Sequence, residues 1–319
     1  MSDRAEPIRI AVLDDYQNVA LSMADWSGLD KHATITVFND HLADPNAVVA
    51  RLQPFDIVCV MRERTPMSRA IIERLPRLRL IASTALQNAS IDLEAAAERG
   101  VKVMHTGYSS TPTIELTWAL ILASSRYLIS ENASLRAGDW QRFVGDDLAE
   151  HTLGVLGLGN VGGAVARIGK AFGMEVIAWS RNLTADRAAE AGAALVTRED
   201  LFRRADIVTI HLVLSGRTRG LVGAEELALM KPTARLVNTS RGSIVVEADL
   251  LAALRSGKIA AAAVDVFDQE PLPNDHPFRS QANLLATPHI GYVSRGLYAR
   301  FYQDTVDNIR QWLDARDGC

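Results

Sequence analysis

Short apolar runs alternate with amphipathic stretches along almost the whole chain. In the first third, the runs are rich in Val, Ile and Leu, and they occupy positions 8–13, 35–38, 56–61, 78–83 and 101–105. The stretches between them, such as 68–75 and 93–100, space their apolar residues as a helix requires. Strands that alternate with helices predict parallel βαβ units, with helices on both faces of a sheet.

A second series of apolar runs begins at residue 152 and continues to residue 289. Its members lie at 152–159, 175–180, 205–214, 234–240, 261–267 and 283–289. A chain of 319 residues is long enough for two domains, so we expect two doubly wound, parallel-sheet α/β domains. The amphipathic stretch 294–316 could pack back onto the first domain. The expected domains are therefore 1–104 with 291–319, and 105–290.

A long apolar segment, 111–140, separates the two series. Thr111-Pro112 suits a helix N-terminus, and the pattern predicts one helix of roughly 25 residues. Its apolar side chains outnumber those that one buried face requires. Burial between domains or subunits would explain this excess, and so would a fully buried core helix.

Composition narrows the class of protein. The net charge of −4 and the interleaved acidic and basic residues give no sign of a nucleic-acid or membrane partner. The two cysteines, Cys59 and Cys319, allow no disulfide framework and lie in no metal-ligand spacing. The first residues have no leader pattern, and no stretch approaches 18 uninterrupted apolar residues. We therefore expect a cytoplasmic protein.

A glycine-rich turn follows the first strand of the second series. Gly157, Gly159 and Gly162 enclose Asn160 and Val161, and they lead directly into an amphipathic helical stretch. The first glycine permits a tight turn, the second lets a pyrophosphate approach the backbone, and the third allows close contact between helix and strand. Strand, glycines, helix and next strand fall within about 30 residues, which is the context of a dinucleotide site.

The next strand ends at Ser180-Arg181, where NAD-binding proteins usually carry an acidic residue for the ribose 2′-hydroxyl. Ser and Arg can instead donate hydrogen bonds to a 2′-phosphate, which favours NADP over NAD. The alternative is that Arg181 is a solvated loop residue and that NAD binds through other contacts. His211 ends a later apolar strand, and we expect it to line the cofactor pocket.

Three further patches, 237–245, 265–273 and 287–292, follow the glycine motif in order. Together the four motifs resemble those of the D-isomer-specific 2-hydroxyacid dehydrogenases, the family of phosphoglycerate dehydrogenase and glyoxylate/hydroxypyruvate reductase. The resemblance implies a flavodoxin-like substrate domain, a Rossmann nucleotide domain, and a substrate cleft between them with hinges near 105 and 290. It also implies a homodimer formed through the nucleotide domain.

The resemblance assigns chemical roles to three residues. Arg241 matches the guanidinium that binds the substrate carboxylate and polarises the 2-oxo group, a task for a planar, permanently charged fork. His289 matches the general acid/base, because imidazole titrates near neutrality. Glu270 matches the carboxylate behind that imidazole, which favours its protonated form. Related formate dehydrogenases have Gln at this position, so Glu270 favours 2-hydroxyacid chemistry.

The same matching places Thr239 and Asp265 near the nicotinamide, where Asp265 would orient the carboxamide. Val213 and Thr218 match positions near the adenosine and pyrophosphate. No metal is expected, because Arg and imidazolium can carry the charge that develops on the substrate oxygen.

The substrate-binding region departs from the family pattern. Many members have a Gly-x-Gly turn whose N–H groups hold the substrate carboxylate, whereas this chain reads Ala85-Leu86-Gln87 there. We expect a backbone cradle at these three residues, with Leu86 adding apolar surface. Arg62 matches an arginine that faces substrate, although a surface pair with Glu63 is an equal alternative.

The sequence therefore predicts an NAD(P)-dependent oxidoreductase that interconverts a small 2-oxo acid and its D-2-hydroxy acid. The main alternative is a non-catalytic dinucleotide-sensing scaffold on the same fold. A dehydrogenase for a one-carbon or inorganic substrate is disfavoured by Glu270.

Overall fold

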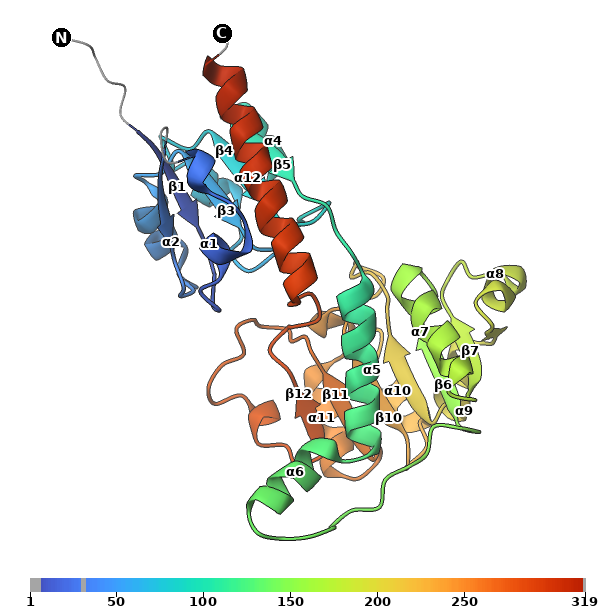
Figure 1. The fold of residues 1–319 in the computed structure, drawn as a ribbon. Coiled ribbons are helices and arrows are strands. Elements are labelled where there is room, and N and C mark those ends of the chain that lie inside the picture. Colours follow the sequence, from blue (N-terminus) through green and yellow to red (C-terminus); the bar gives the residue numbers. More distant parts are fainter. Residues whose placement is uncertain (1–6, 30–32, 318–319) are drawn as a thin grey trace, which may run out of the picture. The chain divides into compact units, whose positions relative to one another are not determined.

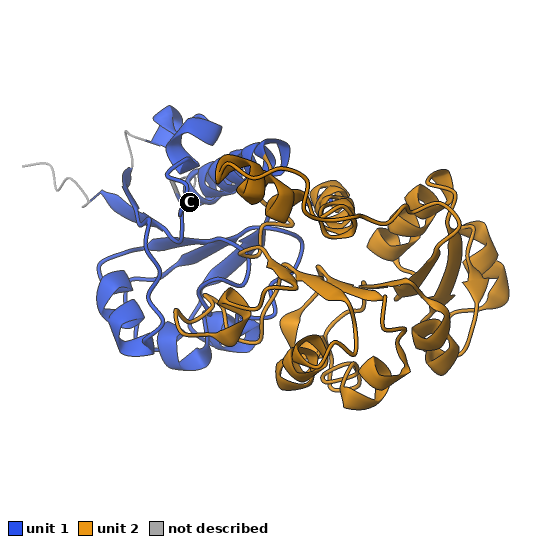
Figure 2. Ribbon diagram, turned by 90° about the horizontal axis from the view of Figure 1, so that it is seen from below, with its two compact units in different colours: residues 1–109, 295–319 blue, residues 110–294 orange. Residues whose placement is uncertain are grey.

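The computed structural model describes residues 7–29 and 33–317, which belong to two compact units (Figures 1 and 2). Unit 1 comprises residues 1–109 and 295–319, and unit 2 comprises residues 110–294. The sequence placed the divisions at 104/105 and 290/291. In the structure they fall a few residues later, next to the starts of helices α5 (Thr111–Ser125) and α12 (Arg295–Asp317), because each helix stays with the unit on which it packs.

Unit 1 is built on a five-stranded parallel sheet with strand order β2-β1-β3-β4-β5. This is the flavodoxin-like order, in which ligands bind where the strand order reverses. The strands are β1 (Ile8–Val12), β2 (Ala33–Val37), β3 (Ile57–Val60), β4 (Leu80–Ser83) and β5 (Lys102–His105). The helices are α1 (Ala20–Met23), α2 (Pro45–Leu52), α3 (Arg69–Ile72), α4 (Leu93–Glu98) and α12, with a 3-10 turn at Ser27–Leu29.

Helices cover both faces of this sheet, as the buried strands of a parallel sheet require (Figure 2). Helices α2, α3 and α4 share one apolar core with the strands. Helix α12 packs against α1, β4 and β5, and buries Leu297, Phe301, Val306, Ile309 and Leu313. The C-terminal stretch is therefore an amphipathic helix that completes unit 1.

Unit 2 contains a seven-stranded parallel sheet with strand order β12-β11-β10-β9-β6-β7-β8. The order reverses between β6 and β9, which is the switch point at which doubly wound sheets bind dinucleotides. The strands are β6 (Thr152–Leu156), β7 (Glu175–Trp179), β8 (Ala194–Leu195), β9 (Ile207–Ile210), β10 (Arg235–Asn238), β11 (Ala261–Val264) and β12 (Leu284–Ala286). The prediction of two doubly wound parallel-sheet domains is confirmed.

The helices of unit 2 form two apolar layers. Helices α5 and α7 (Asn160–Ala171) pack on one core, and α9 (Arg198–Arg204), α10 (Ala224–Leu229) and α11 (Glu247–Arg255) pack on the other. The remaining elements are α6 (Leu128–Arg136), α8 (Ala185–Glu190) and two 3-10 helices, η2 (Gly242–Ile244) and η3 (Pro277–Arg279).

The prediction of one long helix after residue 111 is wrong. Helix α5 ends at Ser125, and Tyr127 takes a left-handed conformation (φ 52°) before α6 begins. The ring of Tyr127 stacks on Phe143 at 5.0 Å and lies 5.8 Å from the guanidinium of Arg235. Those two contacts come from residues distant in sequence, so the local pattern could not reveal the break. Trp118, Leu120 and Ile121 are buried in the core of unit 2, which explains the apolar character of α5.

Among the described helices, none combines the length and the continuous apolar character that crossing a bilayer would need.

Candidate active site

The glycine-rich turn joins β6 to α7, and the structure requires glycine at its three positions to different degrees. Gly157 has φ 102°, and a side chain there would lie 2.8 Å from the backbone carbonyl of His211. A side chain at Gly162 would overlap the carbonyl oxygen of Gly157. A side chain at Gly159, by contrast, would meet no atom within 4 Å. The fold itself thus demands the first and third glycines but leaves open space at the second.

That open space lies at the N-terminus of α7. Gly159 is the N-cap, no side chain caps the helix, and its first turn holds no acidic residue. The early N–H groups of a helix have no partner within the helix, and they carry the positive end of its dipole. Asn160 and Val161 occupy these first positions. The turn therefore fits the pyrophosphate of a dinucleotide, which would approach the backbone at Gly159.

The end of β7 carries no carboxylate. Trp179 is the last residue of the strand, Ser180 is half-buried and Arg181 is exposed. This edge of the sheet therefore presents a hydroxyl and a guanidinium.

The loop after β9 contains three of the predicted cofactor residues. The hydroxyl of Thr218 donates to the carbonyl of Val213 (2.7 Å) and accepts from the N–H of Ser215 (2.8 Å), so it fixes the shape of the loop. The side chain of Val213 is exposed. Nε2 of His211 lies 2.9 Å from the hydroxyl of Thr209, and burial lowers the pKa of His211 to about 3.

His211 is therefore expected to carry no charge at neutral pH. Below pH 6.5, the ordinary pKa of histidine, His211 binds a proton in the unfolded chain but not in the folded chain. The free energy of unfolding therefore decreases as the pH falls. A His211→Gln variant, which can keep the bond to Thr209, should lose stability less steeply between neutral pH and about pH 4. Urea unfolding at several pH values measures this. An acid dependence as steep as that of the unmodified protein would contradict it.

Arg241 follows β10 in a turn that Asn238 closes. The Asn238 amide donates to the carbonyl of Arg241 (3.0 Å), and its oxygen accepts from the N–H of Ser240 (3.0 Å). The guanidinium of Arg241 is half-buried and donates to the carbonyl of Ser240 (2.8 Å). A side chain at position 242 would overlap the backbone of Phe267. Gly242 therefore lets the turn that carries Arg241 pack directly on the loop after β11.

His289 and Glu270 form a close pair. Nδ1 of His289 lies 2.5 Å from Oε2 of Glu270, and the other oxygen of Glu270 accepts from the N–H of Phe267 (2.9 Å). His289 has φ 52°, and its ring meets that of Tyr292 edge-to-face at 5.3 Å. Since Nδ1 is occupied, Nε2 is the ring nitrogen left to exchange a proton with a substrate.

The residues around Glu270 stabilise the ionised form of its carboxylate. Burial alone would raise its pKa, but the bond from His289, the Phe267 N–H and the charge of Arg241 together lower the pKa below its usual 4.5. Glu270 therefore remains a carboxylate at neutral pH, and a carboxylate beside an imidazole favours the protonated ring.

Asp265 is fully buried and holds the segment that carries His289. Its oxygens accept from the hydroxyl of Thr287 (2.6 Å) and from the N–H groups of Ile290 (2.8 Å) and Gly291 (2.7 Å). Burial raises the pKa of Asp265, and these bonds and the nearby His289 offset the rise only in part. Thr239, the other residue predicted near the nicotinamide, shares a hydroxyl–hydroxyl bond of 2.8 Å with Thr117.

The predicted substrate-binding residues lie at the carboxyl ends of β3 and β4 in unit 1. Arg62 has φ 54°, donates its N–H to Thr84 (2.7 Å), and lies 5.4 Å from the ring centre of Tyr108. Its guanidinium is also 3.8 Å from the carboxylate of Glu63.

The expected cradle of three N–H groups needs a correction. The N–H of Ala85 already donates to the hydroxyl of Thr106 (2.7 Å), so it is engaged within unit 1. Within the described residues, no acceptor is bonded to the N–H of Leu86 or Gln87. The Leu86 side chain is 65% exposed. Thr106 lies 21 positions away from Ala85, so no local pattern can reveal that bond.

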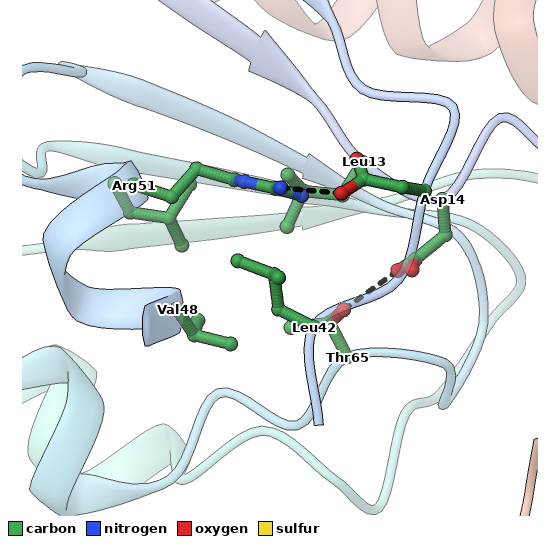
Figure 3. Close-up of a pocket in the computed structure, with 8 residues that line it drawn as sticks. Leu13, Asp14, Leu42, Val48, Arg51 and Thr65 are labelled. Atoms are coloured by element: carbon green, nitrogen blue, oxygen red, sulfur yellow. Dashed lines mark hydrogen bonds and ion pairs between the residues drawn. The ribbon is translucent and has the colours of Figure 1, made fainter. Parts of the chain in front are cut away.

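A small cavity also lies at this end of unit 1, where Asp14 accepts from the hydroxyl of Thr65 (Figure 3). Its volume of about 10 Å³ holds at most one water molecule, so it cannot admit an organic substrate. Within the described residues, no group of three His, Cys, Asp or Glu side chains is placed to hold a metal ion.

Comparison with known proteins places these features in a family. Residues 118–291 match the family model described as "D-isomer specific 2-hydroxyacid dehydrogenase, NAD binding domain". The glyoxylate reductase of Aeropyrum pernix is 42% identical over 249 residues, which cover 75% of this chain and 74% of the relative. The chain belongs to the D-isomer specific 2-hydroxyacid dehydrogenase family.

Two further relatives extend the match. The crystal structure of a phosphoglycerate oxidoreductase from Vibrio cholerae has a TM-score of 0.91 and 36% identity, covering 97% of this chain and 99% of that one. The D-3-phosphoglycerate dehydrogenase of Methanocaldococcus jannaschii is 40% identical over 238 residues, which span 73% of this chain and 45% of the relative. The chain is thus an NAD(P)-dependent oxidoreductase that interconverts 2-oxo and D-2-hydroxy acids, and the non-catalytic scaffold is not favoured.

Proposed function

We propose that Arg241, Glu270 and His289 are the catalytic residues of this dehydrogenase and that its substrate is a small 2-oxo acid. The observation that carries the proposal is the 2.5 Å pairing of His289 with an ionised Glu270, which leaves Nε2 free to transfer a proton. Arg241 lies in the turn that packs on the Glu270 loop through Gly242, and its charge acts on Glu270.

Each residue then has a defined task. Arg241 binds the substrate carboxylate and polarises the 2-oxo group, and the protonated His289 gives its Nε2 proton to the substrate oxygen. Glu270 holds the ring in the orientation that presents Nε2. The bound dinucleotide supplies the hydride that C2 of the substrate receives, or accepts it in the reverse reaction. Gly157, Gly159, Gly162 and the first turn of α7 bind its pyrophosphate, with His211, Val213, Thr218, Thr239 and Asp265 as further cofactor residues.

Unit 1 is proposed as the substrate domain and unit 2 as the nucleotide domain. The N–H groups of Leu86 and Gln87 are the proposed anion donors of unit 1, and Ala85 contributes by shaping that turn (φ 70°). Arg62 is proposed as a second positive group for the substrate.

A panel of 2-oxo acids tests the reaction: glyoxylate, hydroxypyruvate, phosphohydroxypyruvate, pyruvate and longer chains, each with NADH and NADPH. We expect turnover with a short substrate such as glyoxylate, which the names of several relatives specify. The absence of turnover with every member, in protein that still binds dinucleotide, would refute the proposal.

The cofactor is proposed to be NADP in preference to NAD. Support comes from Ser180 and Arg181, which stand where a carboxylate would repel a 2′-phosphate. Arg181→Ala is expected to lower kcat/KM for NADPH roughly tenfold, the value of one charged hydrogen bond, and to leave kcat/KM for NADH unchanged. Initial rates with both cofactors measure this, and a strong NADH preference in the unmodified enzyme would contradict it.

We also propose a homodimer, formed through unit 2, in the cytoplasm. Support comes from a group of exposed apolar side chains on α6 and the loop after it: Leu128, Ile129, Leu135, Trp140, Phe143 and Val144. The loop is fixed, since Glu131 accepts from the N–H groups of Arg142 and Phe143, and Arg235 pairs with Asp146 at 2.7 Å. Ordered apolar surface of this kind marks interaction sites.

Val144→Asp is expected to shift the protein from dimer to monomer in analytical ultracentrifugation, because a charge would be buried in the interface. Leu93→Asp, at an exposed apolar position on α4 of unit 1, is the matched control and should leave the mass unchanged. A monomeric unmodified protein, or a Val144→Asp variant that stays dimeric, would contradict the proposal. Cell fractionation tests the location.

A further inference from the structure

The carboxylate of Glu270 lies on a loop that has no regular secondary structure. No helix or strand covers residues 265–276, and the Glu270 side chain is 33% exposed. A side chain on a loop without regular secondary structure keeps one position only where contacts restrict it. The 2.5 Å bond to His289 therefore depends on the contacts that hold the two ends of this loop in place.

Glu247, the first residue of α11, contacts both ends. Its Oε1 accepts the N–H of Asp268 (2.9 Å), two residues before Glu270. Its Oε2 lies 3.3 Å from Nε2 of His276, six residues after Glu270. Nδ1 of His276 accepts the N–H of Phe278 (3.3 Å), so the ring proton belongs on Nε2, facing Glu247.

The 3-10 helix η2, which precedes α11, also ties the Glu270 loop to the turn that carries Arg241. The hydroxyl of Ser243 donates to the carboxylate of Asp268, and Gly242 packs against the backbone of Phe267. The side chains of Glu247 and His276 are each 20% exposed, so their contact is partly shielded from solvent. The segment from Gly242 to Glu247 thus contacts the Glu270 loop on both sides of Glu270 and joins it to the turn that carries Arg241.

We propose that Glu247 and His276 form a second carboxylate–imidazole pair, whose role is to position Glu270 beside His289. This inference rests on the proposed catalytic role of Glu270 and His289. Glu247 bonds neither of them, so it is a positioning residue that acts through the loop. A role limited to the start of α11 is a poor explanation, because Asp249 also supplies a negative charge to that first turn.

Glu247→Gln tests the proposal in the full-length enzyme. The amide oxygen can accept from Asp268, but the amide N–H₂ then faces the N–H of His276, and the pair is lost. We expect kcat for 2-oxo acid reduction to fall about tenfold, less than the loss of the general acid itself, with KM for the dinucleotide unchanged. Glu190→Gln, an exposed glutamate of α8, is the matched control and should retain full kcat.

The pH profile separates positioning from general destabilisation. His289 faces the carboxylates of Glu270 and Asp265, Arg241 acts on Glu270, and Glu247 faces His276. If Glu270 moves away, the protonated ring loses its partner, so the alkaline decline of the reduction rate should shift to lower pH. A lower thermal midpoint with an unshifted profile would overturn the proposal.

A double-mutant cycle with Glu270→Gln decides whether Glu247 acts through Glu270. We expect Glu247→Gln to cost little more activity once Glu270 has been replaced, whereas independent effects would multiply and overturn the proposal. If Glu247→Gln does not fold, His276→Gln and His276→Asn provide the same test. The Gln amide can reach the position of Nε2 and should retain activity, the Asn amide cannot, and equal activities would overturn the proposal. Failure of the catalytic assignment itself would show separately, as full activity of Glu270→Gln alone.

Discussion

Replacing His289 with alanine is expected to lower kcat for 2-oxo acid reduction by on the order of 10²–10⁴, the usual contribution of a positioned general acid. The bond of Nδ1 to Glu270 orients the ring and leaves Nε2 as its exchangeable position. Without the imidazole, water must supply the proton that the substrate oxygen receives, while the charge of Arg241 is still present. Arg241 would remain to bind the carboxylate, so KM for the 2-oxo acid should change far less than kcat.

Dinucleotide affinity provides the control for this prediction. His289 lies on the segment after β12, whereas the glycine turn lies after β6, so binding of NADPH by fluorescence titration should be unaffected. His151→Ala, in the turn before β6, is the matched histidine replacement and should keep full kcat. An active His289→Ala variant would show that another group delivers the proton, and a variant that no longer binds NADPH would place His289 in the cofactor site instead.

Much of the fold could be predicted because parallel strands that are buried on both faces have continuous apolar sequences. β3 and β9, for example, are wholly buried and were found from such runs. β8 consists of two exposed residues and left no pattern. The break between α5 and α6 depends on Tyr127, whose left-handed conformation is accompanied by contacts with Phe143 and Arg235. Contacts over such separations are absent from any local pattern.

In the candidate site, too, some features could be predicted from the sequence and others could not. Arg241, Glu270 and His289 can be proposed from the sequence because the short motifs that contain them resemble those of the family. Sequence did not reveal that Glu247 reaches both ends of the Glu270 loop, because a glutamate at a helix start is usual in any protein. Nor did it reveal that Asp265 holds Ile290 and Gly291. Supporting contacts depend on tertiary structure, whereas the proposed reacting groups lie in short motifs of consecutive residues.

Arg241→Ala is expected to lower kcat/KM for the 2-oxo acid by roughly 10³, because it removes both a carboxylate partner and a charge that stabilises the developing alkoxide. Arg241→Lys keeps the charge but loses the planar fork, so it should recover only part of that loss.

The pH profile adds a signature that follows from Glu270. The charge of Arg241 is one of the effects that hold the pKa of Glu270 below 4.5, so the carboxylate is ionised above that lowered value and becomes protonated as the pH falls through it. Without Arg241 the protonation of Glu270 should begin at higher pH, and the acid-side loss of activity should move upward with it, whereas Arg241→Lys should keep the acid limb near its original position. Profiles of kcat for the three proteins measure this. An acid limb that does not move in Arg241→Ala would mean that the guanidinium exerts no field on the Glu270–His289 pair, and its role would then reduce to binding the substrate carboxylate.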